Sequence, residues 1–208
     1  MAPDAYVERA NTQAWPDRRQ LTKPVGRQAG TDRRGRYFDG VRLAVGDVVV
    51  YASHGAGRVV ARGKTVVLGV EQEIVVLELA AGLSVTLPMQ RAREQLRPLV
   101  SEADMRRVQE TLREDRALSG DAWVKRLKQG QAKLRGGDPL ELAEVVRDST
   151  RRERMLRGKG TKSQLSPGEK ELYVKARQLL SGEIGLARGL EPAEASAWID
   201  EQLAPMGS

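Results

Sequence analysis

Residues 45–87 of this 208-residue chain decide the fold, and they read VGDVVVYASHGAGRVVARGKTVVLGVEQEIVVLELAAGLSVTL. Short runs rich in β-branched residues alternate here with glycines; the runs are 48–51, 59–61, 65–68, 74–77 and 83–87. Four or five such strands within about 45 residues favour a small β barrel over βαβ units. We therefore expect a small β barrel over residues 41–97.

The chain changes to helical spacing after Pro88, which predicts an all-α bundle over residues 98–204. Each expected helix has a start signal. These signals are Ser101 for a helix to about Glu114, Ser119 or Asp121 before Trp123, Asp138-Pro139, the capping box Ser166-Pro167-Gly168-Glu169, and Glu191-Pro192. Residues 157–162 (RGKGTK) are expected to form a flexible basic loop. The predicted fold class is thus β + α, a barrel followed by a helical bundle.

The first 40 residues differ from the rest, with eight basic and five acidic side chains and almost no aliphatic periodicity. Prolines and paired arginines such as Arg18-Arg19 are typical of a disordered basic arm. The predicted organisation is therefore an arm (1–40), a barrel (41–97) and a helical domain (98–204).

Composition excludes several function classes. The absence of cysteine excludes thiol nucleophiles and cysteine metal sites, and His54 is the single histidine. No apolar run approaches the length of a transmembrane helix. We expect a cytoplasmic protein that is not an enzyme and that holds no metal or cofactor.

One motif imitates a nucleotide-binding loop. Gly57–Thr65 (GRVVARGKT) ends in Gly-Lys-Thr, but five residues separate its glycines where a phosphate loop has four, and a strand follows in place of a helix. We interpret this segment as two hairpin turns, and His54 as a turn residue.

Positive charge is concentrated in one part of the helical domain. The chain carries a net charge of +7, and residues 123–177 alone hold fifteen basic and seven acidic side chains. Such an excess indicates an anionic partner. Trp123 begins a helix that also carries Lys125, Arg126 and Lys128. With Leu127 and Leu134 it could form an ordinary core stripe, or it could stay exposed and wedge into a nucleic-acid groove.

A second basic group lies on the following helix. Arg147, Arg151 and Arg154 are spaced to share one helix face, with Arg152 beside it. In the sequence nearby, only Asp148 and Glu153 could neutralise them. We expect this face to be exposed and to contact DNA through Arg147, Arg151 and Arg152.

Several blocks together resemble the CarD/CdnL family of bacterial RNA polymerase-binding transcription regulators. They occur in the family's order between about residues 43 and 187. They are VGDVVVYASHGAG (45–57), Trp123 with Lys125-Arg126 and Lys128, LAEVVRD (142–148), LSPGEK (165–170) and ARQLL (176–180).

The resemblance implies a Tudor-like barrel that docks on the RNA polymerase β subunit. It also implies a helical domain that contacts double-stranded promoter DNA at the upstream edge of the bubble and stabilises the open complex. Trp123 matches the family's wedge tryptophan, and Lys128, Arg152 and Lys170 match backbone contacts. The expected polymerase-binding residues are Thr65, Val67, Val85 and Thr86. We expect a monomer associated with the nucleoid.

Departures from the family leave alternatives open. Ala52 stands where proline is frequent, and Thr65 and Thr86 stand where relatives place arginine. Docking would then depend on backbone pairing along a strand edge. The alternatives are a general RNA- or ribosome-binding module and a protein-interaction adaptor.

Overall fold

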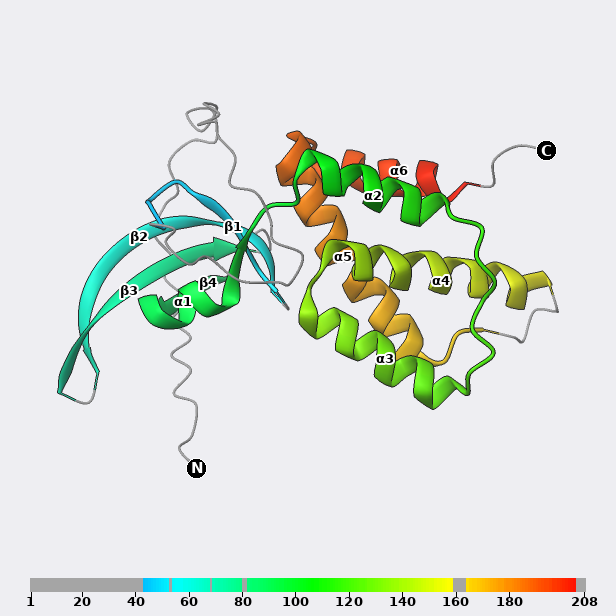
Figure 1. Ribbon diagram of the computed structural model, residues 1–208, viewed down its shortest axis with the longest axis horizontal. Helices are drawn as coiled ribbons and strands as arrows, with labels where there is room; N and C mark the ends of the chain where they lie inside the picture. Colours follow the sequence, from blue (N-terminus) through cyan, green and yellow to red (C-terminus); the bar gives the residue numbers. More distant parts are fainter. Residues whose placement is uncertain (1–42, 53, 68, 80–81, 159–163, 205–208) are drawn as a thin grey trace.

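The computed structural model describes residues 43–52, 54–67, 69–79, 82–158 and 164–204. The arm predicted over residues 1–40 lies outside these ranges. A sheet lies at one end of the molecule and a group of helices at the other (Figure 1). The order of strands first and helices second confirms the predicted fold class.

The sheet is antiparallel and has five strands in the order β4-β3-β2-β1-β5. The strands are β1 (Val48–Tyr51), β2 (Gly55–Val67), β3 (Val70–Leu79), β4 (Ser84–Pro88) and β5 (Leu96–Pro98). Helix α1 (Met89–Gln95) connects the two edge strands, β4 and β5. It places Met89 and Ala92 in the core of the sheet domain, so it covers apolar surface that an open sheet would expose.

The two hairpin turns predicted within residues 57–65 are wrong. Both glycines lie inside β2, where Gly57 pairs with Leu79 and Gly63 with Ile74. A side chain at Gly57 would lie 2.3 Å from the carbonyl oxygen of Glu78, so glycine is required there by close approach and not by a turn. The β2–β3 reversal occurs instead at Gly69, whose φ is +80°.

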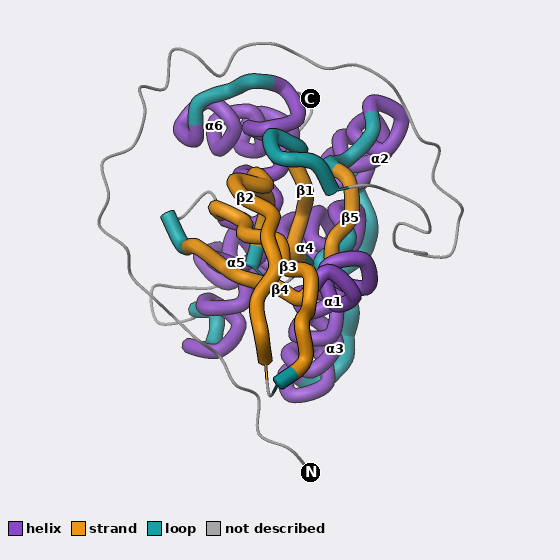
Figure 2. Tube along the Cα trace, turned by 90° about the vertical axis from the view of Figure 1, so that its left-hand side faces the viewer, coloured by secondary structure: helices purple, strands orange, loops and turns teal. Residues whose placement is uncertain are grey.

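Five further helices form the second domain. They are α2 (Glu102–Arg113), α3 (Trp123–Gly136), α4 (Pro139–Gly158), α5 (Pro167–Arg188) and α6 (Pro192–Leu203). Their shared core contains Leu112, Leu142, Val146, Leu180 and Ile199. Figure 2 shows these helices behind the strands when the molecule is viewed from the sheet.

Most of the predicted helix starts are confirmed. Ser101 accepts a hydrogen bond from the amide of Asp104, Ser166 and Glu169 form a capping box, and Asp138 accepts bonds from the amides of Leu140 and Glu141. The loop predicted at 157–162 is wrong for Arg157 and Gly158, which end α4, while 159–163 lie outside the described residues. Within the described residues, none of the helices is long and apolar enough to cross a membrane.

Candidate functional site

The first turn of α3 presents two large apolar side chains to solvent. Trp123 is 53% exposed and Val124 is 57% exposed. Leu127 and Leu134 of the same helix pack against the core, but Trp123 does not belong to that stripe. The core interpretation of Trp123 is therefore wrong, and the partly exposed aromatic is confirmed.

The prediction that Ser119 or Asp121 caps this helix is wrong. The N-cap is Ala122, which provides no side-chain hydrogen bond. The Ser119 hydroxyl accepts from the amide of Asp121, and the Asp121 carboxylate accepts from Lys125 at 2.9 Å. The hydrogen bond from Lys125 is the main reason that the pKa of Asp121 is below its usual value. Ser119 and Asp121 therefore do not cap the helix. They order the segment before it, and Asp121 also holds the side chain of Lys125.

Exposed cations lie on the same helix as this apolar pair and on α5, which the Arg126–Glu169 ion pair joins to α3. Lys128 of α3 and Lys170 of α5 are exposed, and within the described residues neither takes part in an ion pair. Lys125 keeps 62% of its side chain exposed despite its bond to Asp121. These three lysines remain available to an anionic ligand.

Arg126 has a different environment from its neighbouring lysines. Its side chain is only 21% exposed and donates to Glu169 of α5 at 2.7 Å and to the backbone carbonyl of Asp121. Burial opposes ionisation of Glu169, but hydrogen bonds from Arg126 and Ser166 outweigh it and hold the pKa of this carboxyl below its usual value. Arg126 therefore ties α3 to the start of α5.

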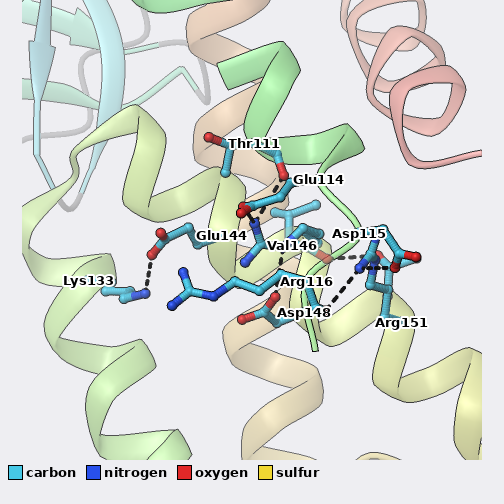
Figure 3. Close-up of polar contacts among 11 residues, drawn as sticks. Thr111, Glu114, Asp115, Arg116, Lys133, Glu144, Val146, Asp148 and Arg151 are labelled. Atoms are coloured by element: carbon cyan, nitrogen blue, oxygen red, sulfur yellow. Dashed lines mark hydrogen bonds and ion pairs between the residues drawn. The ribbon is translucent and has the colours of Figure 1, made fainter. Parts of the chain in front are cut away.

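The exposed arginine face predicted on α4 is wrong for Arg147. This residue is 1% exposed and donates to Asp148 at 2.8 Å, to Glu114 at 2.5 Å and to the carbonyl of Thr111. Figure 3 labels the three partners, Thr111, Glu114 and Asp148, and marks the polar contacts among the residues drawn with dashed lines. A guanidinium buried in this way has no surface for a phosphate, so we leave Arg147 out of the candidate interface.

Arg151 and Arg152 also make contacts that their own helix does not supply. Arg151 donates to Asp115 at 2.8 Å and to the carbonyl of Arg116, as Figure 3 shows. Arg152 donates to the carbonyl of Ser119 at 2.9 Å. Burial, followed by the nearby charge of Arg126, lowers the pKa of Arg152. Both arginines hold the segment between α2 and α3 against α4, and both remain partly accessible.

The sequence did not predict the two acidic residues that pair with Arg147 and Arg151 of α4. Glu114 and Asp115 are 33 and 36 positions away from their arginine partners. They follow the end of α2, where their charges resemble those of any solvated segment, so the sequence contains no signal for these pairs.

The four residues predicted to bind polymerase do not share one environment. Thr65 lies opposite Gln72, and Thr86 lies opposite Val76. Because Gln72 and Val76 are four residues apart on β3, this register places both threonines on the same face of the sheet. Val85 lies on the other face, 7% exposed in the core, and Val67 is the last residue of β2.

In addition to the outer edge of β5, two strand edges lie beside the threonines predicted to bind polymerase. β4 pairs with β3 on one side only, and β1 covers β2 only from Gly55 to Arg58. Within the described strands, residues 61–67 of β2 thus have a neighbour on one side only. Thr65 lies on this second edge and Thr86 on the first, so the sheet has two candidate docking edges.

A metal centre has no support in the described part of the chain, where no group of three or more His, Asp or Glu could hold an ion.

Comparison with protein families agrees with this arrangement. Residues 43–100 match the CarD-like/TRCF RID domain, and residues 107–200 match the CarD C-terminal domain. Together the two matches cover both structural parts and define an RNA polymerase-interacting transcription factor. The chain belongs to the CarD/CdnL family.

Proposed function

We propose that this protein binds RNA polymerase through its sheet and promoter DNA through α3 and the helices beside it, and so stabilises the open complex. The observation that carries the proposal is the exposed pair Trp123 and Val124 at the first turn of α3, next to exposed lysines. Large apolar side chains cost free energy in water, and side chains of this kind unstack base steps in the minor groove.

The neighbouring cations have two different roles. Lys125, Lys128 and Lys170 contact DNA phosphates, and such contacts add affinity without recognising the base sequence. Arg126 and Arg152 hold the helix and its preceding segment in place. The proposed DNA contacts are thus Trp123, Lys125, Lys128 and Lys170. Arg151 and Arg152, which are only partly accessible, contribute at the edge of this interface.

The proposed effect on the promoter requires no catalysis. A protein that binds the open complex more tightly than the closed one shifts the equilibrium by the difference in affinity. A wedge with a few phosphate contacts corresponds to roughly 1–3 kcal/mol, or several-fold to about a hundredfold.

A junction-binding experiment tests the wedge without polymerase. The full chain should bind a duplex that ends in an unpaired fork more tightly than the same duplex fully paired, because an already unstacked step removes the unstacking cost. Trp123→Ala should abolish this preference, while Val174→Ala, at an exposed valine of α5 outside this pair, should retain it. Equal affinity of the unaltered chain for the two DNAs would exclude the wedge.

A second experiment tests polymerase docking. The full chain should co-purify with RNA polymerase and with its β subunit. The double variant Thr65→Arg, Thr86→Arg should bind more tightly, because arginine adds charge-assisted hydrogen bonds on the same sheet face. Absence of co-purification would exclude polymerase docking for this protein, although the family relationship would stand. Binding of RNA in preference to DNA would favour the RNA-binding alternative.

A further inference from the structure

One buried ion pair connects the two structural parts. Arg97 of β5 donates two hydrogen bonds to the carboxylate of Glu183 on α5, at 2.5 Å and 2.7 Å. Their side chains are 16% and 2% exposed. The amide of Val100, at the start of the connection to α2, donates to the same carboxylate at 2.9 Å. Three hydrogen bonds from the sheet side thus converge on one carboxylate of the helical domain.

The same arginine reaches the helix that carries Trp123. Arg97 also donates to the carbonyl of Gly137, the C-cap of α3, at 2.6 Å. Gly137 has a φ of +64°, and a side chain there would lie 2.6 Å from the carbonyl oxygen of Ala52, next to the end of β1. The end of α3 therefore lies directly on the sheet domain, with no side chain between the two backbones.

This geometry is directional, unlike the apolar contacts around it. Burying a carboxylate is expensive unless its acceptors are satisfied, and a guanidinium satisfies both oxygens only in one plane and at one distance. Apolar contacts such as that between Leu179 and Gly55 have no such preference. A small rotation of one domain would break several of these hydrogen bonds at once.

We propose that Arg97 and Glu183 are positioning residues that fix the sheet domain and α3 in one orientation. The proposal rests on the proposed function for its consequence: a polymerase-bound sheet then holds Trp123 at a set distance from the docking edges. Neither residue contacts DNA or polymerase in this account. Loss of the pair should leave each binding step intact and weaken their coupling.

A distance measurement tests the positioning directly. Because the chain contains no cysteine, labels can be placed with Gln90→Cys on α1 and Gln131→Cys on α3, two exposed positions. Spin-label distances in the full chain should give a narrow distribution. Glu183→Gln, which keeps the shape but removes the charge, should broaden it. Arg97→Lys, which keeps the charge but loses the fork, should do the same and provides a second variant if the first folds poorly.

Arg177→Lys is the matched control. Arg177 makes a comparable set of bonds, to Tyr173, Ser196 and Asp200, but entirely within the helical domain. Its replacement should leave the distribution narrow. The proposal would be overturned if the distance distribution stayed narrow in both Glu183→Gln and Arg97→Lys. It would also be overturned if the distribution broadened as much in Arg177→Lys as in these two variants.

The functional consequence is measured separately. In the Glu183→Gln variant, DNA affinity and polymerase co-purification should each stay within about twofold, while open-complex lifetime should fall by roughly fivefold or more. A broadened distribution with an unchanged lifetime would overturn the coupling. If the unaltered chain itself does not prolong the lifetime, the proposed function fails, while the distance measurement still decides the positioning.

Discussion

At the residue scale, cations that look alike in the sequence have opposite environments. Arg147 is buried and bonded to three partners, whereas Lys128 is exposed and, within the described residues, has no ion-pair partner. The first supports the fold, and the second is available to DNA.

This contrast predicts different effects for two substitutions. Arg147→Ala should lower the free energy of unfolding by about 2–3 kcal/mol, because it removes a buried hydrogen-bond network. Lys128→Ala should change it by about 0.5 kcal/mol or less. Lys128→Ala should instead reduce the slope of DNA affinity against salt by about one. Urea denaturation and a salt titration measure the two effects, and a reversed ranking would contradict the assignment.

The single histidine predicts a pH dependence. Burial, followed by the charge of Lys175, lowers the pKa of His54 below 6.5. As pH falls through 6.5, the unfolded chain therefore takes up a proton before the folded chain does, and the free energy of unfolding decreases.

Urea denaturation between pH 5 and pH 7 should show this decrease. His54→Gln should flatten it, because no other histidine titrates in that range. A slope that is the same in the variant would assign the pH dependence to other groups.

At the element scale, α3 is held to the bundle by two partly buried leucines, Leu127 and Leu134, and by polar contacts. Gly130 is its only buried residue, and it lies against Leu172 of α5. Two ion pairs, Arg126–Glu169 and Lys133–Glu144, connect the helix to α5 and α4. The helix that presents Trp123 therefore has the weakest apolar anchoring of the described bundle.

Glu169→Gln should loosen this helix selectively. Glutamine can still complete the capping box with Ser166, but it loses the charge that pairs with Arg126. Hydrogen exchange should show the opening free energy of α3 amides falling by about 1 kcal/mol. Amides of α4 should be unaffected, and the exposed control Glu171→Gln should have no effect. Equal protection of α3 in both variants would show that the pair does not anchor it.

Local signals in the sequence predicted most helix starts, but they did not predict contacts between residues far apart in the chain. The box at Ser166 and Glu169 depends on residues three positions apart, so the pattern is visible in the chain. At Gly63, strand pairing with Ile74 overrode the turn preference of glycine. Burial of Arg147 depends on Glu114, 33 positions away, and no spacing rule shows such a contact.

At the scale of the whole molecule, the proposed binding regions lie on two different structural parts. One end carries two candidate docking edges, and the other carries an exposed tryptophan beside available lysines. Arg97 and Glu183 lie between these ends. The fold class and the partial exposure of Trp123 could be predicted from the sequence and the family resemblance. The ion pair between Arg97 and Glu183 could not be predicted, because the two residues are 86 positions apart.

The lifetime of the open promoter complex tests the central claim most directly. With RNA polymerase bound to a promoter and challenged by competitor DNA, the unaltered chain should prolong the lifetime. Trp123→Ala should remove most of this prolongation, by several-fold to about a hundredfold, while co-purification with polymerase stays unchanged. A Trp123→Ala variant that binds polymerase and prolongs the lifetime as fully as the unaltered chain would contradict the account.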